Sequence, residues 1–418
     1  MTTDPPDPRS ETAVEPGDEP KWLTAGVKGI GGASLLSDAG HEIPTALLPS
    51  LLTSTLGAPA AALGLIEGVS DGLAGLARLG GGALADDPQR RQRVAVGGYV
   101  TTAVLSAATA GTTAAWQVAV LRAGAWTARG LRVPARNALL ADVVPASAYG
   151  RAYGFERAMD NLGAIVGPVL AIVLVAVVGV RWAIALSVIP GLLAAVAIIY
   201  AIRHTPKPAK AEHQPIRIRI RPVLRGRLGR LMIGISLFEL GNCAATLLIL
   251  RATDLLSPGR SADSATQLAI GLYVAYNVAA TLVSVPAGQV GDRTGAARTL
   301  VFGVAAFAVA YTVFAVGPAS VIGLASAFVA AGIGIGIVET AEHAAVATLA
   351  PDQLRGSAFG LLAAVQSGGN LVASAIAGIL YTAVSPAWAF SFLAVAMIAS
   401  AVILVATGDT RRTRLAGS

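Results

Sequence analysis

The chain has 418 residues, of which 54% are hydrophobic and 13% are charged, and its mean hydropathy is +0.66. A soluble globular protein carries about 25% charged residues, so this composition excludes an ordinary soluble domain. The 47 glycines lie among apolar runs that are rich in small residues, as in membrane bundles, where close packing holds helices together. A single cysteine excludes a disulfide framework.

The first segment, residues 1–22, is rich in Asp, Glu and Pro and has no apolar core. We expect it to be a disordered cytoplasmic tail. No cleavable signal peptide is apparent in it. The first hydrophobic helix is therefore expected to act as its own insertion signal.

Twelve segments are apolar and long enough to cross a bilayer, which takes about 20 mostly apolar residues. In chain order they are 24–52, 59–84, 93–113, 115–140, 150–178, 181–202, 229–251, 266–290, 297–317, 320–348, 356–382 and 386–407. They group into two six-helix bundles, at 23–203 and 229–407, joined by a basic linker at 204–228 and followed by a cytoplasmic tail at 408–418. The predicted fold class is an all-α integral membrane protein with 12 transmembrane helices.

Charges in the connections predict the orientation. Arginines gather after the even-numbered helices, in the linker and in the C-terminal tail, whereas most other connections are nearly uncharged. Lys and Arg accumulate on the cytoplasmic side. Both termini and the linker are therefore predicted to be cytoplasmic, in a bacterial-type inner membrane.

The net charge of +7 and the alternating run Ile216–Arg221 raise the possibility of a nucleic-acid partner. Basic stretches beside membrane helices usually meet anionic lipid headgroups. We therefore expect membrane lipids as partners and no nucleic acid.

The two halves of the sequence are related by a constant offset of 206 positions. Gly82 pairs with Gly288 and Asp86 with Asp292, and the segments 145–154 and 351–360 then match in the same register. Chance matches are common in a chain rich in Gly and Ala, but an ungapped register across two separated motifs is not. Two parallel six-helix halves with a site between them suit alternating access.

The connections after the second helix of each half resemble the Gly-x-x-x-Asp-Arg/Lys-x-Gly-Arg-Arg motif of the major facilitator superfamily. The second half matches well and the first in part, since Asp87 and Gln89 replace the basic residue and the glycine. The resemblance implies 12 helices in two pseudo-symmetric bundles (6+6) around a central cavity, and we expect a monomer. It also implies that these motifs hold an inner gate shut. The gating residues are Gly82, Asp86, Arg90, Arg91, Gly288, Asp292, Arg293 and Gly295.

Two further segments carry the resemblance. Arg122 in the fourth helix resembles the family's helix-4 arginine, which assists proton coupling, although a structural ion pair explains it equally well. Arg129, Arg132 and Arg136 follow and are interpreted as gate or snorkelling residues. In the fifth helix the segment with Gly163, Gly167 and Pro168 resembles a Gly-x-x-x-Gly-Pro element of antiporter and efflux branches, and favours export.

Ionisable residues inside membrane helices mark proton relays or substrate contacts. In this architecture helices 1, 4, 7 and 10 line the cavity, and most such residues lie on them. Some members of the set are expected to form internal ion pairs with arginines instead. The candidates for proton coupling or the substrate cavity are Asp38, His41, Glu42, Arg122, Asp160, Glu239, Glu339, Glu342 and His343.

The leading hypothesis is a secondary transporter, proton-coupled, for a small amphipathic or lipophilic organic solute. No phosphate-binding loop is present, so ATP is not expected to drive it directly, and we expect neither enzymatic activity nor a cofactor. One alternative is transport of a transition metal such as iron, with Asp38, His41, Glu42 and Cys243 offering O, N and S ligands. The other is a membrane sensor or scaffold of the same fold that transports nothing.

Overall fold

The computed structural model describes residues 22–205, 216–318 and 320–408. The predicted tails at 1–22 and 408–418 therefore lie almost wholly outside the described residues, as does much of the 204–228 linker. Six long helices form the first half of the described chain. They are α1 (Ala25–Ser50, continued by a π-helical turn at Leu51–Thr55), α2 (Ala60–Ala85), α3 (Pro88–Ala108), α4 (Ala115–Asp142), α5 (Tyr149–Leu186) and α6 (Val188–Arg203).

A short helix at the end of the linker leads into the second half. The helices there are α7 (Ile220–Val223), α8 (Gly226–Glu239), α9 (Ala245–Leu256), α10 (Ala262–Thr294), α11 (Ala296–Val316), α12 (Val321–Leu349), α13 (Arg355–Ala383) and α14 (Pro386–Gly408). Single 3-10 turns precede α5, at Ala146–Ala148, and α13, at Asp352–Leu354. Each of the twelve predicted segments overlaps one or two of these helices.

The structure corrects two of the predicted segments. The seventh, 229–251, is not continuous, because the chain leaves the helical path between α8 and α9. The amide of Ala244 donates to Ser374 Oγ at 2.8 Å, and Asn370 Nδ2 donates to the carbonyl of Asn242 at 2.8 Å, so α13 supplies partners to backbone groups that the break releases. In the predicted gap before the sixth segment, Gly179 with φ +78° makes a kink, and helix continues on both sides of it.

Within the described residues, seven helical spans are long and apolar enough to cross a membrane, one of them running through α5 and α6 as a single stretch. The others are α3, α10, α11, α12, α13 and α14. The helices α1, α2 and α4 carry intramembrane charges, and α8 and α9 have only 14 and 12 residues. The count of twelve crossings thus stays a prediction.

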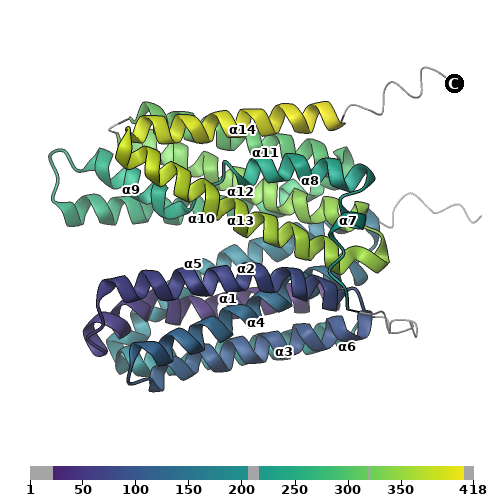
Figure 1. Cartoon of the computed structure of the whole chain (residues 1–418), viewed down its shortest axis with the longest axis horizontal. Helices are drawn as coiled ribbons and strands as arrows, with labels where there is room; N and C mark the ends of the chain where they lie inside the picture. The colour runs from purple at the N-terminus through teal and green to yellow at the C-terminus, as the bar shows by residue number, and fades with distance from the viewer. Residues whose placement is uncertain (1–21, 206–215, 319, 409–418) are drawn as a thin grey trace, which may run out of the picture.

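The two halves form two bundles that lie side by side (Figure 1). Within them α1 packs against α5 and α6, and α2 against α4, while α12 packs against α10 and α11. Between them α5 packs against α10 and α2 against α13. Helix starts repeat the sequence offset, since Tyr149 begins α5 and Arg355, 206 positions later, begins α13.

The two bundles are joined closely at the end of the molecule where α7 lies, which we call the linker end. Towards the opposite end, the helices that pair across the halves present large exposed side chains. Leu65 of α2 is 69% exposed, Val177 of α5 is 76% exposed and Leu371 of α13 is 68% exposed. The described contacts between the halves therefore close one end of the interface and leave the same helices uncovered towards the other.

Candidate functional site

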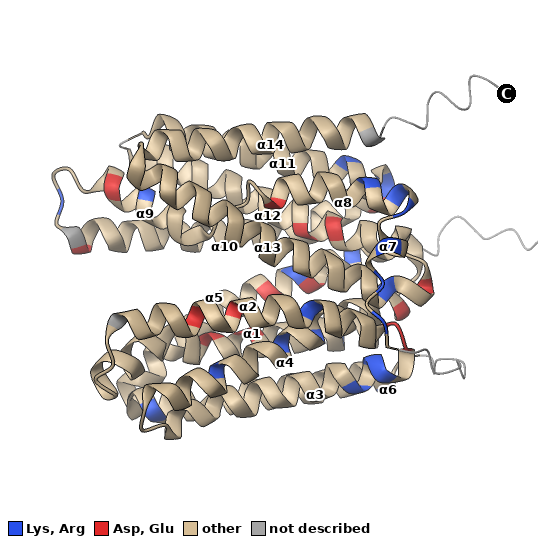
Figure 2. Cartoon of the chain, in the orientation of Figure 1, with Lys and Arg blue, Asp and Glu red and all other residues tan. Residues whose placement is uncertain are grey.

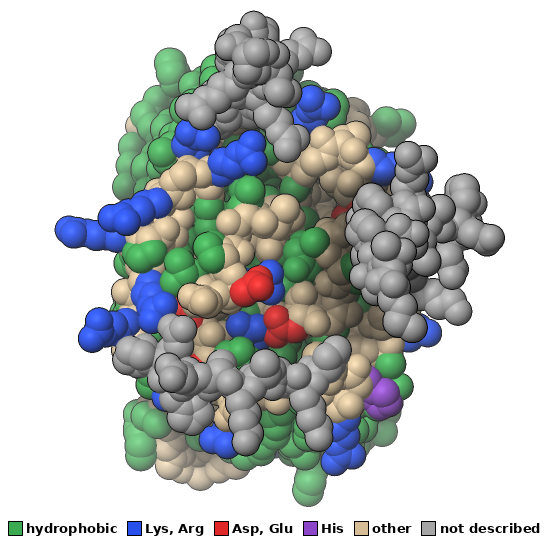
Figure 3. All heavy atoms as spheres, turned by 90° about the vertical axis from the view of Figure 1, so that its right-hand side faces the viewer, with side chains coloured by type: hydrophobic (Ala, Val, Ile, Leu, Met, Phe, Trp, Pro, Cys, Tyr) green, Lys and Arg blue, Asp and Glu red, His purple; other side chains and the backbone are tan. Residues whose placement is uncertain are grey.

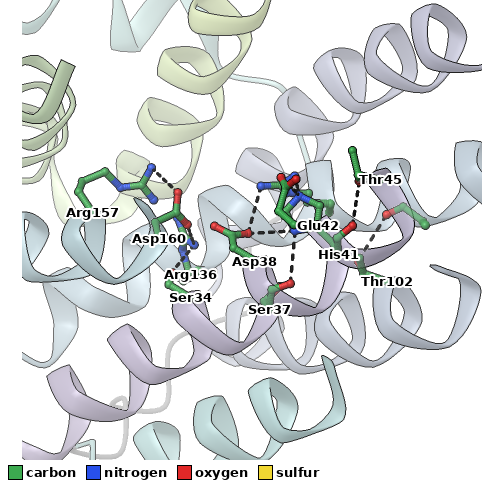
Figure 4. Close-up of polar contacts among 12 residues, drawn as sticks. Ser34, Ser37, Asp38, His41, Glu42, Thr45, Thr102, Arg136, Arg157 and Asp160 are labelled. Atoms are coloured by element: carbon green, nitrogen blue, oxygen red, sulfur yellow. Dashed lines mark hydrogen bonds and ion pairs between the residues drawn. The ribbon is translucent and has the colours of Figure 1, made fainter. Parts of the chain in front are cut away.

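Four ionisable side chains of α1 and α4 form one cluster in the first half (Figure 4). Arg129 Nη2 donates to Asp38 Oδ1 at 3.2 Å, and Arg129 Nη1 lies 2.6 Å from His41 Nε2. His41 Nδ1 is 3.2 Å from Asp38 Oδ1, and His41 Nε2 is 3.3 Å from Glu42 Oε1. The side chain of Asp38 is 4% exposed and that of Glu42 is 27% exposed. Glu42 is thus the acid of this cluster that solvent reaches.

The contacts of His41 make competing demands on the proton of its ring. A guanidinium has no acceptor atom, so the contact with Arg129 requires a lone pair on Nε2. The neutral ring then carries its hydrogen on Nδ1, which faces Asp38. An ionised Glu42 requires the opposite, a hydrogen on Nε2. Nε2 of His41 therefore accepts from Arg129 when it carries no hydrogen and donates to Glu42 when it carries one.

A second cluster joins α4 and α5 directly beside the first. Arg136 Nη2 is 2.8 Å from Glu156 Oε1, and Arg157 Nε donates to Glu156 Oε2 at 2.7 Å. Both arginines also contact Asp160, at 3.4 and 3.2 Å. Arg157 reaches across to Glu339 of α12 at 3.8 Å. This last contact links the charged interior of the first half to the second half.

Arg122, a predicted coupling residue, lies in an ion pair at the side of these clusters. Its Nη2 donates to both carboxylate oxygens of Glu67, at 2.9 and 3.1 Å, and its Nη1 donates to Thr45 Oγ1. The guanidinium lies 3.5 Å from the ring centre of Trp126, whose Nε1 donates to Asp71 at 2.8 Å. Arg122 is thus held in an ion pair with Glu67, and its role in proton coupling stays a prediction.

Snorkelling is wrong for Arg132 and Arg136, which are 1% and 4% exposed. Arg136 is held by carboxylates within the bundle. The guanidinium of Arg132 lies 3.9 Å from the ring centre of Tyr99. A snorkelling side chain needs an aqueous end for its charge, and these two have none.

Two buried acids of the second half, Glu239 and Glu342, have amide partners in place of cations. Glu342 is fully buried and accepts from Gln366 Nε2 at 2.9 Å, while its other oxygen has no hydrogen-bond partner among the described residues. Glu239 is 3% exposed and accepts from Asn242 Nδ2 at 3.1 Å. An ionised carboxylate buried without a cation is costly. These two side chains are therefore suited to hold a proton.

His343 lies where the two halves meet. Its ring centre is 5.8 Å from that of Tyr153, in the first half, and 5.9 Å from that of Phe359. Its Nδ1 donates to the carbonyl of Glu339 at 2.6 Å. His343 is thus placed in an aromatic contact between the halves, apart from the cluster around His41.

Cys243, the candidate metal ligand, lies in the break between α8 and α9. It is 5% exposed, and its Sγ is 3.7 Å from Tyr311 Oη. Among residues 22–205, 216–318 and 320–408, no three His, Cys, Asp or Glu side chains are grouped so as to hold a metal ion. Cys243 thus has a tyrosine, not Asp38 or His41, as its polar neighbour.

The predicted packing motif of α5 lies directly behind the acids of α1. A Cβ added at Gly163 would come within 2.9 Å of Asp38 Cβ, and one added at Gly167 within 2.4 Å of Glu42 Cβ. Pro168 follows within the helix. These two glycines allow α1 to lie close against α5. The position of Asp38 and Glu42 within the bundle therefore depends on them.

Two aspartates of the predicted gating motifs join the halves at the linker end. Asp292 of α10 accepts from the amides of Gly150 and Arg151 at the start of α5, at 2.6 and 3.2 Å, and from Arg151 Nε at 2.9 Å. Asp86 accepts from the amide and the hydroxyl of Ser357 in α13, at 2.8 and 2.5 Å. Free amides at a helix start favour a carboxylate. We call these two contacts the latches.

The motif glycines lie between the latches, at close contacts of backbone with backbone. A Cβ added at Gly288 would come within 2.1 Å of the carbonyl of Gly150, and one at Gly82 within 2.7 Å of the carbonyl of Gly356. Gly295 has φ +95° and turns the chain from α10 into α11. In the first half the turn is made without such a glycine. There Asp87 caps α3 by accepting hydrogen bonds from the amides of Gln89 and Arg90.

The three motif arginines have different surroundings. Arg91 is 2% exposed and contacts Asp142 of α4, which also lies 3.5 Å from Arg355 of the second half. Arg90 lies 3.5 Å from Asp87 of its own half, and Arg293 is exposed. Gating by these residues stays a prediction.

Several partners in these contacts were not predicted from the sequence. They are Arg78, which donates to the carbonyl of Ala363 and to Ser367 across the halves, together with Arg151, Arg355 and Ser357. Arg151 and Ser357 occupy equivalent positions in the repeat, so the offset of 206 was a signal that pointed to both.

The family model described as Major Facilitator Superfamily matches residues 30–257 and 243–417. The chain belongs to the Major Facilitator Superfamily. It is 27% identical over 393 residues to an uncharacterized MFS-type transporter of Methanocaldococcus jannaschii, covering 92% of this chain and 95% of that protein. An uncharacterized protein of Mycobacterium tuberculosis is 27% identical over 368 residues, covering 86% of this chain and 87% of that protein.

Solved structures share the MFS fold at low identity. A bacterial homologue of the iron transporter ferroportin in an outward-facing state superposes with a TM-score of 0.72 at 16% identity, over 92% of this chain and 100% of that one. The human organic anion transporter MFSD10 superposes with a TM-score of 0.70 at 14% identity, over 92% of this chain and 100% of that one. The transporter FucP in the outward conformation superposes with a TM-score of 0.67 at 14% identity, over 91% of this chain and 98% of that one. The predicted MFS fold is thus confirmed, and the protein is a multi-pass membrane protein.

Proposed function

We propose that this MFS protein is a proton-coupled secondary transporter that exports a small amphipathic organic solute by alternating access. The cluster of Asp38, His41 and Arg129 carries the proposal. Ionisable groups inside a membrane bundle are costly and usually functional, and this cluster has a protonation-dependent contact at its centre. The largely apolar helices around it suit an amphipathic solute.

The proton path follows from the contacts of His41. A proton arriving at the partly exposed Glu42 passes to His41 Nε2, which then ceases to accept from Arg129 and donates to Glu42. The ring, now charged, gives its Nδ1 hydrogen to Asp38. Asp38 becomes neutral and loses its attraction for Arg129, which is left free to meet a solute or another acid.

Alternating access is supported by the position of the latches. We place the linker end on the cytoplasmic side because arginines gather there (Figure 2), and on this placement both latches close the inner side, which corresponds to an outward-facing state. Two of the structural relatives were solved in outward-facing states. Export as the direction rests on the Gly-Pro element of α5.

Reconstituted protein tests the proposal directly. Liposomes with pyranine inside and an imposed pH gradient are given a panel of amphipathic dyes, beginning with ethidium and rhodamine 6G. Solute-dependent proton flux and counterflow of labelled solute are expected. A sensor or scaffold gives neither, so the absence of counterflow across the panel in folded protein would refute transport.

Transport of a transition metal is the second candidate. Asp38 and His41 on α1, together with the structural likeness to a bacterial homologue of an iron transporter, favour it. Calorimetric titration with Fe²⁺, Co²⁺ and Mn²⁺ tests it. Binding that the His41→Ala/Cys243→Ala variant loses supports a metal cargo, and no binding to the unmodified protein excludes it.

A further inference from the structure

A cavity of about 750 Å³ lies at the linker end of the second half, outside the charged clusters. It is formed where α8, α10, α11, α12 and α14 end or begin, and its volume is within the range of about 300–1,000 Å³ that ligand pockets occupy. Arg227 and Arg230 of α8 and Arg298 of α11 line it. A space-filling view of this end of the molecule shows Lys and Arg side chains spread around its edge (Figure 3).

The three arginines leave the cavity with a strong positive charge. All three are exposed, and in the described part of the chain none of their guanidinium groups makes an ion pair or hydrogen bond. The acid in the wall is Asp292, whose carboxylate already accepts from Gly150 and Arg151. Guanidinium groups favour phosphate as a partner.

Much of the remaining wall is apolar, and part of it lies on the outer surface of the helices. Phe302 of α11 is 67% exposed and Val405 of α14 is 52% exposed, and both line the cavity. A free phosphate would leave this part of the cavity unused. A phospholipid has a phosphate beside an acyl chain, which matches arginines beside membrane-facing apolar side chains.

We propose that this cavity binds the phosphate headgroup of an anionic phospholipid, with Arg227, Arg230 and Arg298 around the phosphate and an acyl chain along Phe302 and Val405. Basic pockets between membrane helices bind such headgroups. The occupant is a membrane glycerophospholipid with net negative charge, such as phosphatidylglycerol.

The lipid also stabilises one conformation. Tyr149 and Gly150 of the first half line the same cavity, and Asp292 in its wall forms a latch. The cavity is therefore complete only when the linker end is closed, and a ligand that binds one state better shifts the population towards it. This effect rests on the alternating access proposed above, whereas the binding does not.

Titration of purified, delipidated full-length protein in neutral detergent tests the binding. Dioctanoyl phosphatidylglycerol, dioctanoyl phosphatidylcholine and glycerol 1-phosphate are compared by native mass spectrometry and by thermal stability. Only phosphatidylglycerol is expected to bind tightly. The triple variant Arg227→Gln/Arg230→Gln/Arg298→Gln should weaken it roughly 100-fold, at about five-fold per arginine.

A matched triple variant, Arg93→Gln/Arg203→Gln/Arg221→Gln, removes the same charge from exposed arginines at the same end, outside the cavity. It should change the affinity less than about three-fold, because the distant charges are screened. Equal losses in the two variants would show a general surface attraction and overturn the site. Equally tight binding of glycerol 1-phosphate would overturn the assignment of a lipid as the occupant of the cavity.

Spin labels measure the conformational effect without any transport. Gln89→Cys and Gln353→Cys, in a Cys243→Ser background, place exposed labels on the two halves at the linker end. Phosphatidylglycerol should narrow the distance distribution towards the short, closed distance, and it should not do so in the cavity variant. Lipid binding with an unchanged distribution would overturn the coupling to closure.

Discussion

Arg355 donates from Nη2 to the hydroxyl of Tyr149 at 3.4 Å, although the two residues lie 206 positions apart. They occupy equivalent positions in the repeat, each as the first residue of its helix, α5 or α13. Two equivalent residues touch only where the pseudo-twofold axis passes between them. The axis therefore leaves the molecule at the linker end, between the two latches.

The latches are two copies of one contact, so their removal should have similar effects. Asp292→Asn or Asp86→Asn weakens hydrogen bonds to a helix start, each worth about 1–3 kcal/mol with a charged acceptor. We expect each variant to raise the population with long distances between labels at Gln89 and Gln353, measured by pulsed electron spin resonance. The double variant should raise it further.

The control for this prediction is Asp352→Asn. The side chain of Asp352 is 84% exposed and contacts Arg355 within its own half. Its loss should leave the distance distribution unchanged. If the control opened the linker end as far as Asp292→Asn does, charge alone and not the latch would govern closure.

The glycines between the latches predict a steric effect on the same equilibrium. In Gly150→Ala the new methyl group would lie about 2.2 Å from the carbonyl of Gly288, and such overpacking costs about 1–3 kcal/mol. Only the closed state has this clash, so the labelled protein should open. Gly97→Ala in α3, where nothing lies within 4 Å of the added Cβ, should leave the distances unchanged.

The turns after α2 and α10 are built by different means, and a substitution in either turn is expected to lower the stability of the protein. Gly295→Ala places a side chain at φ +95° and should cost about 1–2 kcal/mol. Asp87→Ala should cost about 1 kcal/mol through loss of the cap of α3. Thermal unfolding followed by tryptophan fluorescence measures both. No loss of stability in Gly295→Ala would contradict the role of the glycine in the turn.

Much of the fold was predictable because hydrophobic length and the repeat are properties of the chain itself. The motif also singled out Asp86 and Asp292, and both join the two halves in the structure. The partners of the intramembrane charges were not predictable, because spacing along one helix does not say which residue of another helix lies opposite. The break at 240–244 was missed for the same reason, since its backbone partners come from α13.

The different surroundings of two buried glutamates predict different costs of the same substitution. Glu156→Gln removes the charge between Arg136 and Arg157 and leaves Asp160 as the carboxylate that both share, and breaking a buried ion pair costs about 3–5 kcal/mol. Glu342 has an amide partner and no cation, so Glu342→Gln should change the free energy of unfolding by less than about 1 kcal/mol. Melting temperatures of the two variants in detergent measure the two losses of stability. Equal losses would mean that Glu342 is ionised and paired with a cation.

Asp38 is expected to be the coupling acid, and Asp38→Asn should abolish proton-driven transport while the protein stays folded. The substitution keeps the shape of the side chain, which packs on Gly163, but removes the charge that binds Arg129 and takes the proton from His41. Counterflow, which needs no proton gradient, should persist. Proteoliposomes with an imposed pH gradient measure proton-driven transport. Exchange of labelled solute measures counterflow. Unimpaired pH-driven transport in this variant would place the coupling acid elsewhere, with Glu42 and Glu342 as the next candidates.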